Sequence, residues 1–130
     1  MSVTIIIVSY KSDSRIQKCL KNIGKKYKKI IIDTSKDMSL KTKVEKKFPK
    51  TKVILTSNNG YGAAMNYGVK KAKTKYVFMS TPDILLNNKT IKNLLSAAKK
   101  LNDNFAFLSP VTNTSLNKSF IEVENCKGYA

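Results

Sequence analysis

Short runs of apolar, mostly β-branched residues recur along this chain and alternate with longer segments of helical periodicity. The run from Val3 to Ser9 is too short for a helix and lacks polar alternation, so it predicts a strand buried on both faces. Similar runs predict strands at 29–32 (ending at Asp33), 52–56, 76–80 and 105–108, with a further one at 120–123. Helices are expected from Ser12 or Asp13 to Gly24, and at 39–48, 61–72 and 88–101. This alternation predicts an α/β fold, in which right-handed βαβ units form a Rossmann-like, mostly parallel sheet with helices on both faces.

The size and composition of the chain fit one globular domain. With 130 residues, 42% of them apolar and 25% charged, the chain is long enough to bury a core and unlike a disordered or fibrous protein. We therefore expect a single domain over 1–130, in which residues 111–130 are only weakly structured.

Histidine is absent, and the two cysteines, Cys19 and Cys126, lie far apart. Zinc-finger, HExxH, Ser-His-Asp and Cys-His chemistry are therefore excluded. The first residues do not resemble a signal peptide, and no apolar stretch approaches the roughly 18 residues that a membrane span needs. The expected location is the cytoplasm, with reduced thiols and with peripheral contact to the inner face of the membrane as an option.

The formal net charge of +17 comes from 25 basic and 8 acidic residues, and Arg15 is the one arginine. Such an excess normally suggests a nucleic acid or an anionic membrane as partner, although nucleic-acid readers usually use arginine as well. Most of the lysines occur where a predicted helix ends and the next strand begins. In a parallel sheet these junctions lie at the edge opposite the ligand crevice, so we expect most of the charge to face away from the binding site. The clusters are Lys25, Lys26, Lys28 and Lys29; Lys46, Lys47, Lys50 and Lys52; Lys70, Lys71, Lys73 and Lys75; and Lys99 and Lys100.

Three of the few acidic residues follow the carboxyl ends of predicted strands, where ligands of such sheets bind. These are Asp33, Asp37 and Asp83. Carboxylates at this edge suit a divalent cation, which in turn could bridge them to a nucleoside diphosphate. The alternative is that each aspartate caps the loop or helix that follows it.

The segment from Asn58 to Gly68, NNGYGAAMNYG, joins a strand to a helix through two glycines. Glycine permits close backbone approach, and the start of a helix offers free N–H groups to a phosphate. Small residues farther along, Ala63, Ala64 and Gly68, predict close packing of the helix, which could also be the segment's whole role. It does not match a dinucleotide fingerprint, because Met65 replaces the third glycine and the segment follows the third strand.

Three motifs in this order resemble glycosyltransferase family 2, and in particular its rhamnosyltransferase-like members with an NPD segment. The motifs are VTIIIVSYKS, IIIDTSKD and NNGYGAAMNYGVKKAKTKYVFMSTPD, and the resemblance covers about 4–108. It implies the GT-A fold of nucleotide-diphospho-sugar transferases, with strand order 3-2-1-4 for the first four strands.

The resemblance also implies roles for individual residues. Ser9 and Tyr10 would line the nucleobase pocket, and Asp33 would accept hydrogen bonds from the base or ribose. Asp83 would bind Mg²⁺ or Mn²⁺, since it matches the last aspartate of NPD, although Thr81 replaces the asparagine. Because IIIDTSKD is one residue shorter than the corresponding segment of the family, Ser35 and Asp37 are alternatives for the next donor contact. The remaining donor contacts would come from Asn59, Gly60, Gly62 and Asn66.

The expected function is transfer of a sugar from a UDP- or dTDP-type nucleoside-diphosphate sugar to a polysaccharide or lipid-linked acceptor of the cell envelope. Family members are about twice as long, so this chain is expected to be the donor-binding half, with the acceptor site and the catalytic base outside it. Glu122 and Glu124 are the carboxylates left near its end. A homodimer would cover the sheet edge exposed by a missing half. Two alternatives stay open: a lysine-rich module that binds RNA or an anionic membrane, and a nicotinamide- or adenosyl-cofactor enzyme.

Overall fold

The computed structural model describes residues 3–102 and 104–110. The chain divides into two compact units, Met1–Asn87 and Asn88–Ala130, and each is considered by itself. This division does not test the expectation of one domain over 1–130. The predictions that concern residues 111–130 lie outside the described residues; they include those for Cys126, Glu122, Glu124 and the strand at 120–123.

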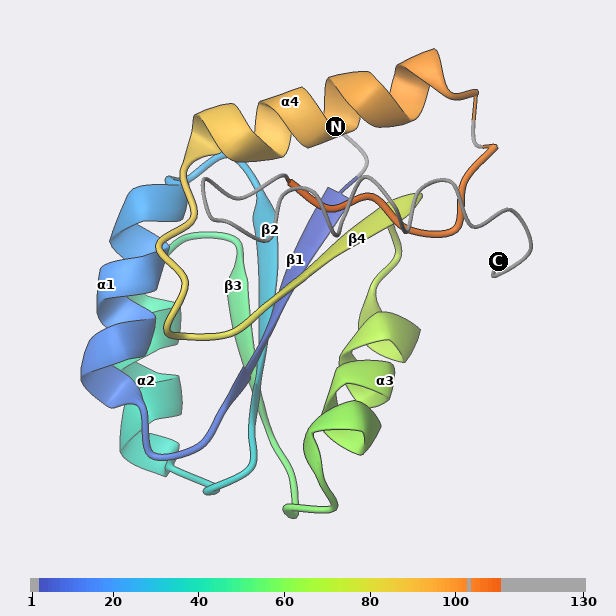
Figure 1. Ribbon diagram of the computed structural model, residues 1–130. Coiled ribbons are helices and arrows are strands. Elements are labelled where there is room, and N and C mark those ends of the chain that lie inside the picture. Colours follow the sequence, from blue (N-terminus) through green and yellow to red (C-terminus); the bar gives the residue numbers. More distant parts are fainter. Residues whose placement is uncertain (1–2, 103, 111–130) are drawn as a thin grey trace, which may run out of the picture. The chain divides into compact units, whose positions relative to one another are not determined.

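The first unit is built on a four-stranded parallel sheet with the order β3-β2-β1-β4 (Figure 1). The predicted α/β class and strand order are therefore confirmed. The strands are β1 (Val3–Ser9), β2 (Lys28–Asp33), β3 (Thr51–Leu55) and β4 (Tyr76–Ser80). They are connected by the helices α1 (Asp13–Ile23), α2 (Met38–Lys47) and α3 (Tyr61–Lys71).

The sheet has helices on both faces, as expected. Figure 1 shows α1 and α2 on one side of the sheet and α3 on the other. All seven residues of β1 are buried, because the strand is covered on both faces and paired on both edges. Since side chains alternate along a strand, Ile6 and Val8 share the α3 side, and Ile5 and Ile7 face the α1 and α2 side.

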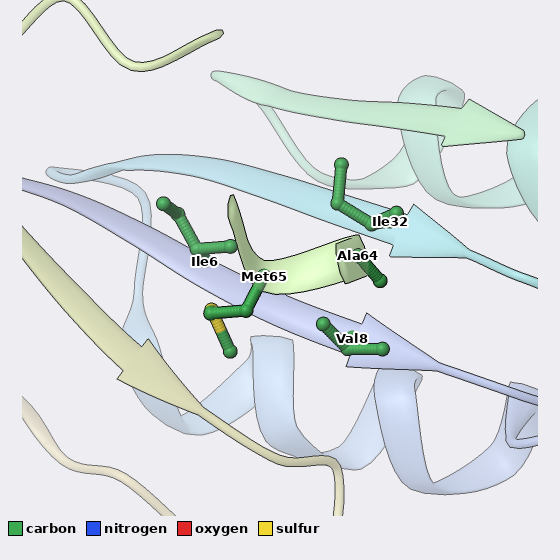
Figure 2. Close-up of a cluster of buried hydrophobic side chains, with 5 residues drawn as sticks. All are labelled: Ile6, Val8, Ile32, Ala64 and Met65. Atoms are coloured by element: carbon green, nitrogen blue, oxygen red, sulfur yellow. The ribbon is translucent and has the colours of Figure 1, made fainter. Parts of the chain in front are cut away.

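Helix α3 packs closely on β1 and β2 through small residues. Ala64 and Met65 join Ile6, Val8 and Ile32 in one buried cluster (Figure 2). A Cβ atom added at Gly68 would lie 2.5 Å from Cγ2 of Ile6. The predicted close packing is thus confirmed for Ala64 and Gly68, but wrong for Ala63, which is exposed because it lies on the outer face of the helix.

The second unit contains the helix α4 (Asn88–Lys100), close to the predicted 88–101. Ile91, Leu95 and Ala98 recur on one face of it, as its periodicity predicts. The strand predicted at 105–108 is wrong, since residues 104–110 contain no strand and Phe107 is 79% exposed. An apolar run forms a strand only where another strand pairs with its backbone, and no strand of the described chain pairs with residues 105–108. Among the described helices, none is long and apolar enough to cross a membrane.

One cation, Lys29, is buried in the first unit. Its side chain is 2% exposed, and Nζ donates a hydrogen bond to the carbonyl oxygen of Gly24 at 2.7 Å. No carboxylate of the described chain forms an ion pair with it. Burial lowers the pKa of Lys29, and the nearby charge of Lys50 lowers it further.

We predict that Gly68→Ala lowers the free energy of unfolding by about 1–3 kcal/mol, because the new methyl group overpacks against Ile6. Gly62→Ala is the matched control, because a Cβ there meets nothing within 4 Å. It should leave stability unchanged or raise it by up to about 1 kcal/mol through helix propensity. Urea denaturation of both variants tests this, and equal effects would contradict the packing argument.

We also predict that Lys29→Met removes a pH-dependent part of the stability. The pKa of Lys29 in the native state lies below its ordinary value of 10.5, so just below pH 10.5 the unfolded chain binds the extra proton. The stability of the unsubstituted protein relative to the variant should therefore rise as the pH increases toward 10.5. Urea titrations between neutral pH and pH 10 would measure this, and parallel curves for the two proteins would contradict it.

Candidate functional site at the carboxyl edge of the sheet

The carboxyl ends of β1 and β2 are joined by hydrogen bonds. Ser9 lies opposite Asp33 in the strand register. The carbonyl oxygen of Ser9 accepts hydrogen bonds from the backbone N–H and the hydroxyl of Thr34, at 2.9 and 3.1 Å. The hydroxyl of Ser9 is itself buried and has no hydrogen-bond partner in the described chain. Buried hydroxyls normally have a partner, and a ligand or a water molecule could supply one here if the residues that cover Ser9 moved.

Asp33 lies fully buried beneath the loop that follows β2. Its carboxylate accepts hydrogen bonds from the hydroxyl of Ser35 at 2.9 Å and from the backbone N–H of Asp37 at 2.7 Å. The Ser35 oxygen also accepts a hydrogen bond from the backbone N–H of Lys11, at 3.2 Å. Asp33 and Ser35 therefore hold together the loops that follow β1 and β2. Because Asp33 is fully buried and both of its carboxylate oxygens accept hydrogen bonds within this loop, a base or ribose could reach it only if the loop moved.

Asp37 caps α2. Its side chain accepts a hydrogen bond from the backbone N–H of Leu40 at 3.1 Å, and the helix starts at the next residue. This satisfies one of the N–H groups that every helix start leaves without a partner. The sequence allowed two roles for Asp37, a carboxylate for a divalent cation or a helix cap, and the structure shows the helix cap.

Tyr10 and Lys11 form the exposed part of the loop after β1. The Tyr10 ring is 52% exposed, and the ammonium of Lys11 lies 5.3 Å from its centre. Lys11 has a positive φ of 46°, which turns the chain sharply before α1. The loop thus presents a flat aromatic surface and a cation at the carboxyl edge.

Asp83 is exposed in the turn after β4 and pairs with Arg15 of α1 at 2.9 Å. Both side chains are about two-thirds exposed, at 69% and 66%, so the ion pair contributes little stability and opens readily. The described residues contain no group of three or more acidic, histidine or cysteine side chains that could hold a metal ion. One carboxylate nevertheless fits the usual manner of Mg²⁺ binding, in which one or two carboxylates act together with substrate phosphates and water.

The start of α3 forms a further exposed group at this edge. The side-chain oxygen of Asn58 accepts a hydrogen bond from the backbone N–H of Gly60, whose φ of 96° requires glycine. No side chain caps the helix there. Of the predicted donor contacts, Asn59, Gly60, Gly62 and Asn66 are all exposed. No hydrogen bond within the described chain joins these four to the Ser9, Asp33 and Ser35 network.

Two residues at this edge make contacts that the sequence did not predict. Arg15 was noted for its rarity but not as the partner of Asp83, and Thr34 was not singled out. Arg15 carried a usable signal, because it is the one arginine of the chain and follows the first strand by six residues.

The family model described as "Glycosyl transferase family 2" matches residues 4–125 of the chain. The chain belongs to this family. Among solved structures it is similar to S. aureus TarS, residues 1–349, with a TM-score of 0.65 and 20% identity over 85% of this chain. It is similar also to the same TarS region in complex with UDP, with a TM-score of 0.65 and 19% identity over 88% of this chain. These likenesses support the GT-A fold of this glycosyltransferase-family chain, which spans only 39–40% of the TarS chains. A search of the curated proteins found no match.

We predict that Asp37→Ala lowers the free energy of unfolding by about 1 kcal/mol, because α2 loses its cap. Asp37→Ser should lose much less, since serine also supplies a capping oxygen. Chemical denaturation of both variants measures the difference, and equal losses would show that the capping hydrogen bond is not the cause.

Proposed function

We propose that this chain binds the nucleoside-diphosphate sugar in a glycosyl transfer to a saccharide or lipid-linked acceptor. The observation that carries the proposal is the network of Ser9, Asp33 and Ser35 at the carboxyl edge of the sheet, where the buried Ser9 hydroxyl has no partner among the residues that the structure describes. Ligands of open α/β sheets bind at this edge. The TarS complex, on a similar fold, holds UDP, which makes UDP the first nucleotide to test, with dTDP next.

In this proposal the nucleoside lies against the loops after β1 and β2. Tyr10 offers its exposed ring to the base, and the half-buried Ser35 offers its hydroxyl group. The buried Ser9 offers its hydroxyl only once the residues that cover it have moved. Asp33 positions Ser35 from below, and accepts from the base or ribose itself if the loop after β2 moves aside. The exposed backbone at Asn59, Gly60 and Gly62, with Asn66 one turn on, forms the other wall. A diphosphate there would meet the free N–H groups at the start of α3.

Asp83 would hold a Mg²⁺ or Mn²⁺ ion together with the diphosphate. Such an ion offsets the negative charge that develops on the departing nucleoside diphosphate. Arg15, which pairs with Asp83 in the structure, carries a fixed positive charge beside the same carboxylate. Once Asp83 binds the ion, the Arg15 guanidinium is free to contact a phosphate.

The acceptor and the proton transfer from its hydroxyl group are not assigned to residues of this chain. A catalytic base must lie within hydrogen-bond reach of that hydroxyl. We also propose that the acceptor belongs to the cell envelope and that the protein contacts an anionic membrane peripherally. A homodimer would cover an exposed edge of the sheet, since exposed sheet edges favour such cover.

The test is thermal stabilisation by UDP, dTDP, GDP, ADP and NAD, each with and without Mn²⁺. A ligand that binds only the folded state stabilises it, by about 2.7 kcal/mol at a concentration of 100 times Kd. We expect one nucleoside diphosphate to raise Tm in a Mn²⁺-dependent way, and Asp83→Asn to remove the Mn²⁺ dependence.

Asp13→Asn is the matched control, because Asp13 is another carboxylate of this edge in an ion pair, with Lys43 at 2.6 Å. It should keep the Mn²⁺-dependent shift. If no nucleotide raises Tm, the donor-binding proposal fails. If both variants lose the shift alike, the metal assignment to Asp83 fails.

A further inference from the structure

The opposite edge of the sheet contains a hollow of about 390 Å³ that is lined mainly by lysines. It lies at the amino ends of the strands, beside the last turn of α3. The expectation that the lysine clusters lie away from the carboxyl edge is thus confirmed for the first unit, but that expectation did not include a hollow among them. The lining residues are Thr4, Lys28, Lys29, Ile30, Lys50, Thr51, Lys52, Lys71, Ala72 and Lys73.

The strand register brings two of these lysines to one face of the sheet. Lys28 lies opposite Thr4, and Lys52 lies opposite Ile30. These positions alternate with the inward-facing residues of the other side, so all four share the face that α3 covers. Lys28 and Lys52 are exposed. They therefore stand on the sheet side of the hollow.

The end of α3 supplies the other side. Lys71 is the last residue of the helix, and Lys73 follows Ala72, whose backbone N–H still bonds to Gly68 at 3.1 Å. Both lysines are exposed. The carbonyl end of a helix carries a partial negative charge of about half an elementary charge. The four positive charges of Lys28, Lys52, Lys71 and Lys73 outweigh it. Lysines from the sheet and from the end of α3 thus line one hollow, although the ammonium of Lys71 lies 5.3 Å from the centre of the Tyr67 ring and would have to turn to meet a ligand.

Among the described carboxylates, Glu45 lies near enough to interact with the charge of Lys52, so these charges are only partly balanced. Among the described residues that line the hollow none is acidic, and the ion pairs of the described chain include none of Lys28, Lys52, Lys71 and Lys73. Of the five acidic residues described, four lie at the carboxyl edge, and the fifth, Glu45, pairs with Lys41. Burial lowers the pKa of Lys29, which also lines the hollow, and the nearby charge of Lys50 lowers it further.

The floor of the hollow is apolar. Ile30 and Ala72 contribute to it, and lysine side chains add their four-carbon stems while their ammonium groups stay in water. The volume lies within the range of small-molecule sites, roughly 300–1,000 Å³. Lysine binds phosphate as a compact point charge without the planar geometry of arginine. The hollow thus suits an anionic group attached to an apolar part.

We propose that this hollow binds a phosphate group that carries an apolar substituent, either in a free organophosphate or in the headgroup region of an anionic phospholipid. Lys28 and Lys52 hold the phosphate from the sheet, and Lys71 and Lys73 hold it from α3. The apolar part lies on Ile30 and Ala72. This site is independent of the donor site, because the two occupy opposite edges of the same sheet.

The test uses inorganic phosphate, hexyl phosphate and phosphatidylglycerol vesicles, with phosphatidylcholine vesicles as the neutral comparison. EDTA and constant ionic strength keep metal-dependent binding and general screening out of the measurement. Titrations followed by amide NMR signals should place hexyl phosphate at Ile30, Lys52 and Ala72, with tighter binding than inorganic phosphate. The double variant Lys28→Gln/Lys52→Gln should weaken binding about tenfold or more, because two charge-assisted hydrogen bonds are lost.

Lys18→Gln/Lys21→Gln is the matched control, since it removes the same charge from exposed positions of α1 outside the hollow. It should change binding less than about twofold, as expected for distant surface charges. Binding to phosphatidylglycerol vesicles alone, with the same dependence on Lys28 and Lys52, supports the proposal with lipid as the source. An RNA oligomer serves as a further anionic probe. If both double variants weaken the binding of all these anions equally, the lysines attract anions diffusely and the proposal is overturned. Absence of binding in every arm, or signals at the Asp83 turn instead, would overturn it as well.

Discussion

The pairing of β1 on both of its edges is the interaction on which the rest of the structure depends. It joins β2 through six residue pairs and β4 through five, so residues from 3 to 80 are brought into one sheet. Because β1 is also covered on both faces, every one of its side chains is buried. A polar substitution in it would leave a polar group without water or a partner, which costs about 1–3 kcal/mol or more.

The same pairing decides what lies at each end of the sheet. In a parallel sheet all strands end at one edge, so the register that sets Ser9 opposite Asp33 also sets Thr4 opposite Lys28. One edge thus collects short polar side chains and carboxylates, and the other collects lysines. The two proposed sites arise from one register and require no separate scaffold. The two proposed sites are nevertheless chemically distinct, because the carboxyl edge combines carboxylates with Lys11 and Arg15, whereas lysine is the one charged residue type that lines the hollow.

The fold was largely predictable because its signals are local. β-branched runs such as Val3–Ser9, helical periodicity and the order of the elements depend on neighbours in sequence. The strand predicted at 105–108 is wrong for the opposite reason, since an apolar run does not show whether a second strand lies beside it.

For the candidate site, the sequence predicted that it lies at the carboxyl edge of the sheet, but it did not predict the contacts between its side chains. The burial of Asp33 under Ser35 and the ion pair of Asp83 with Arg15, 68 residues away, depend on loop geometry that no local pattern encodes.

The gathering of lysines at one end of the strands has an electrical consequence for the first unit. At the amino ends the described lysines line one hollow, whereas at the carboxyl edge the cations Lys11 and Arg15 lie among carboxylates. An approaching anion is therefore attracted more strongly by the amino ends of these strands than by their carboxyl ends, even before any side chain makes contact.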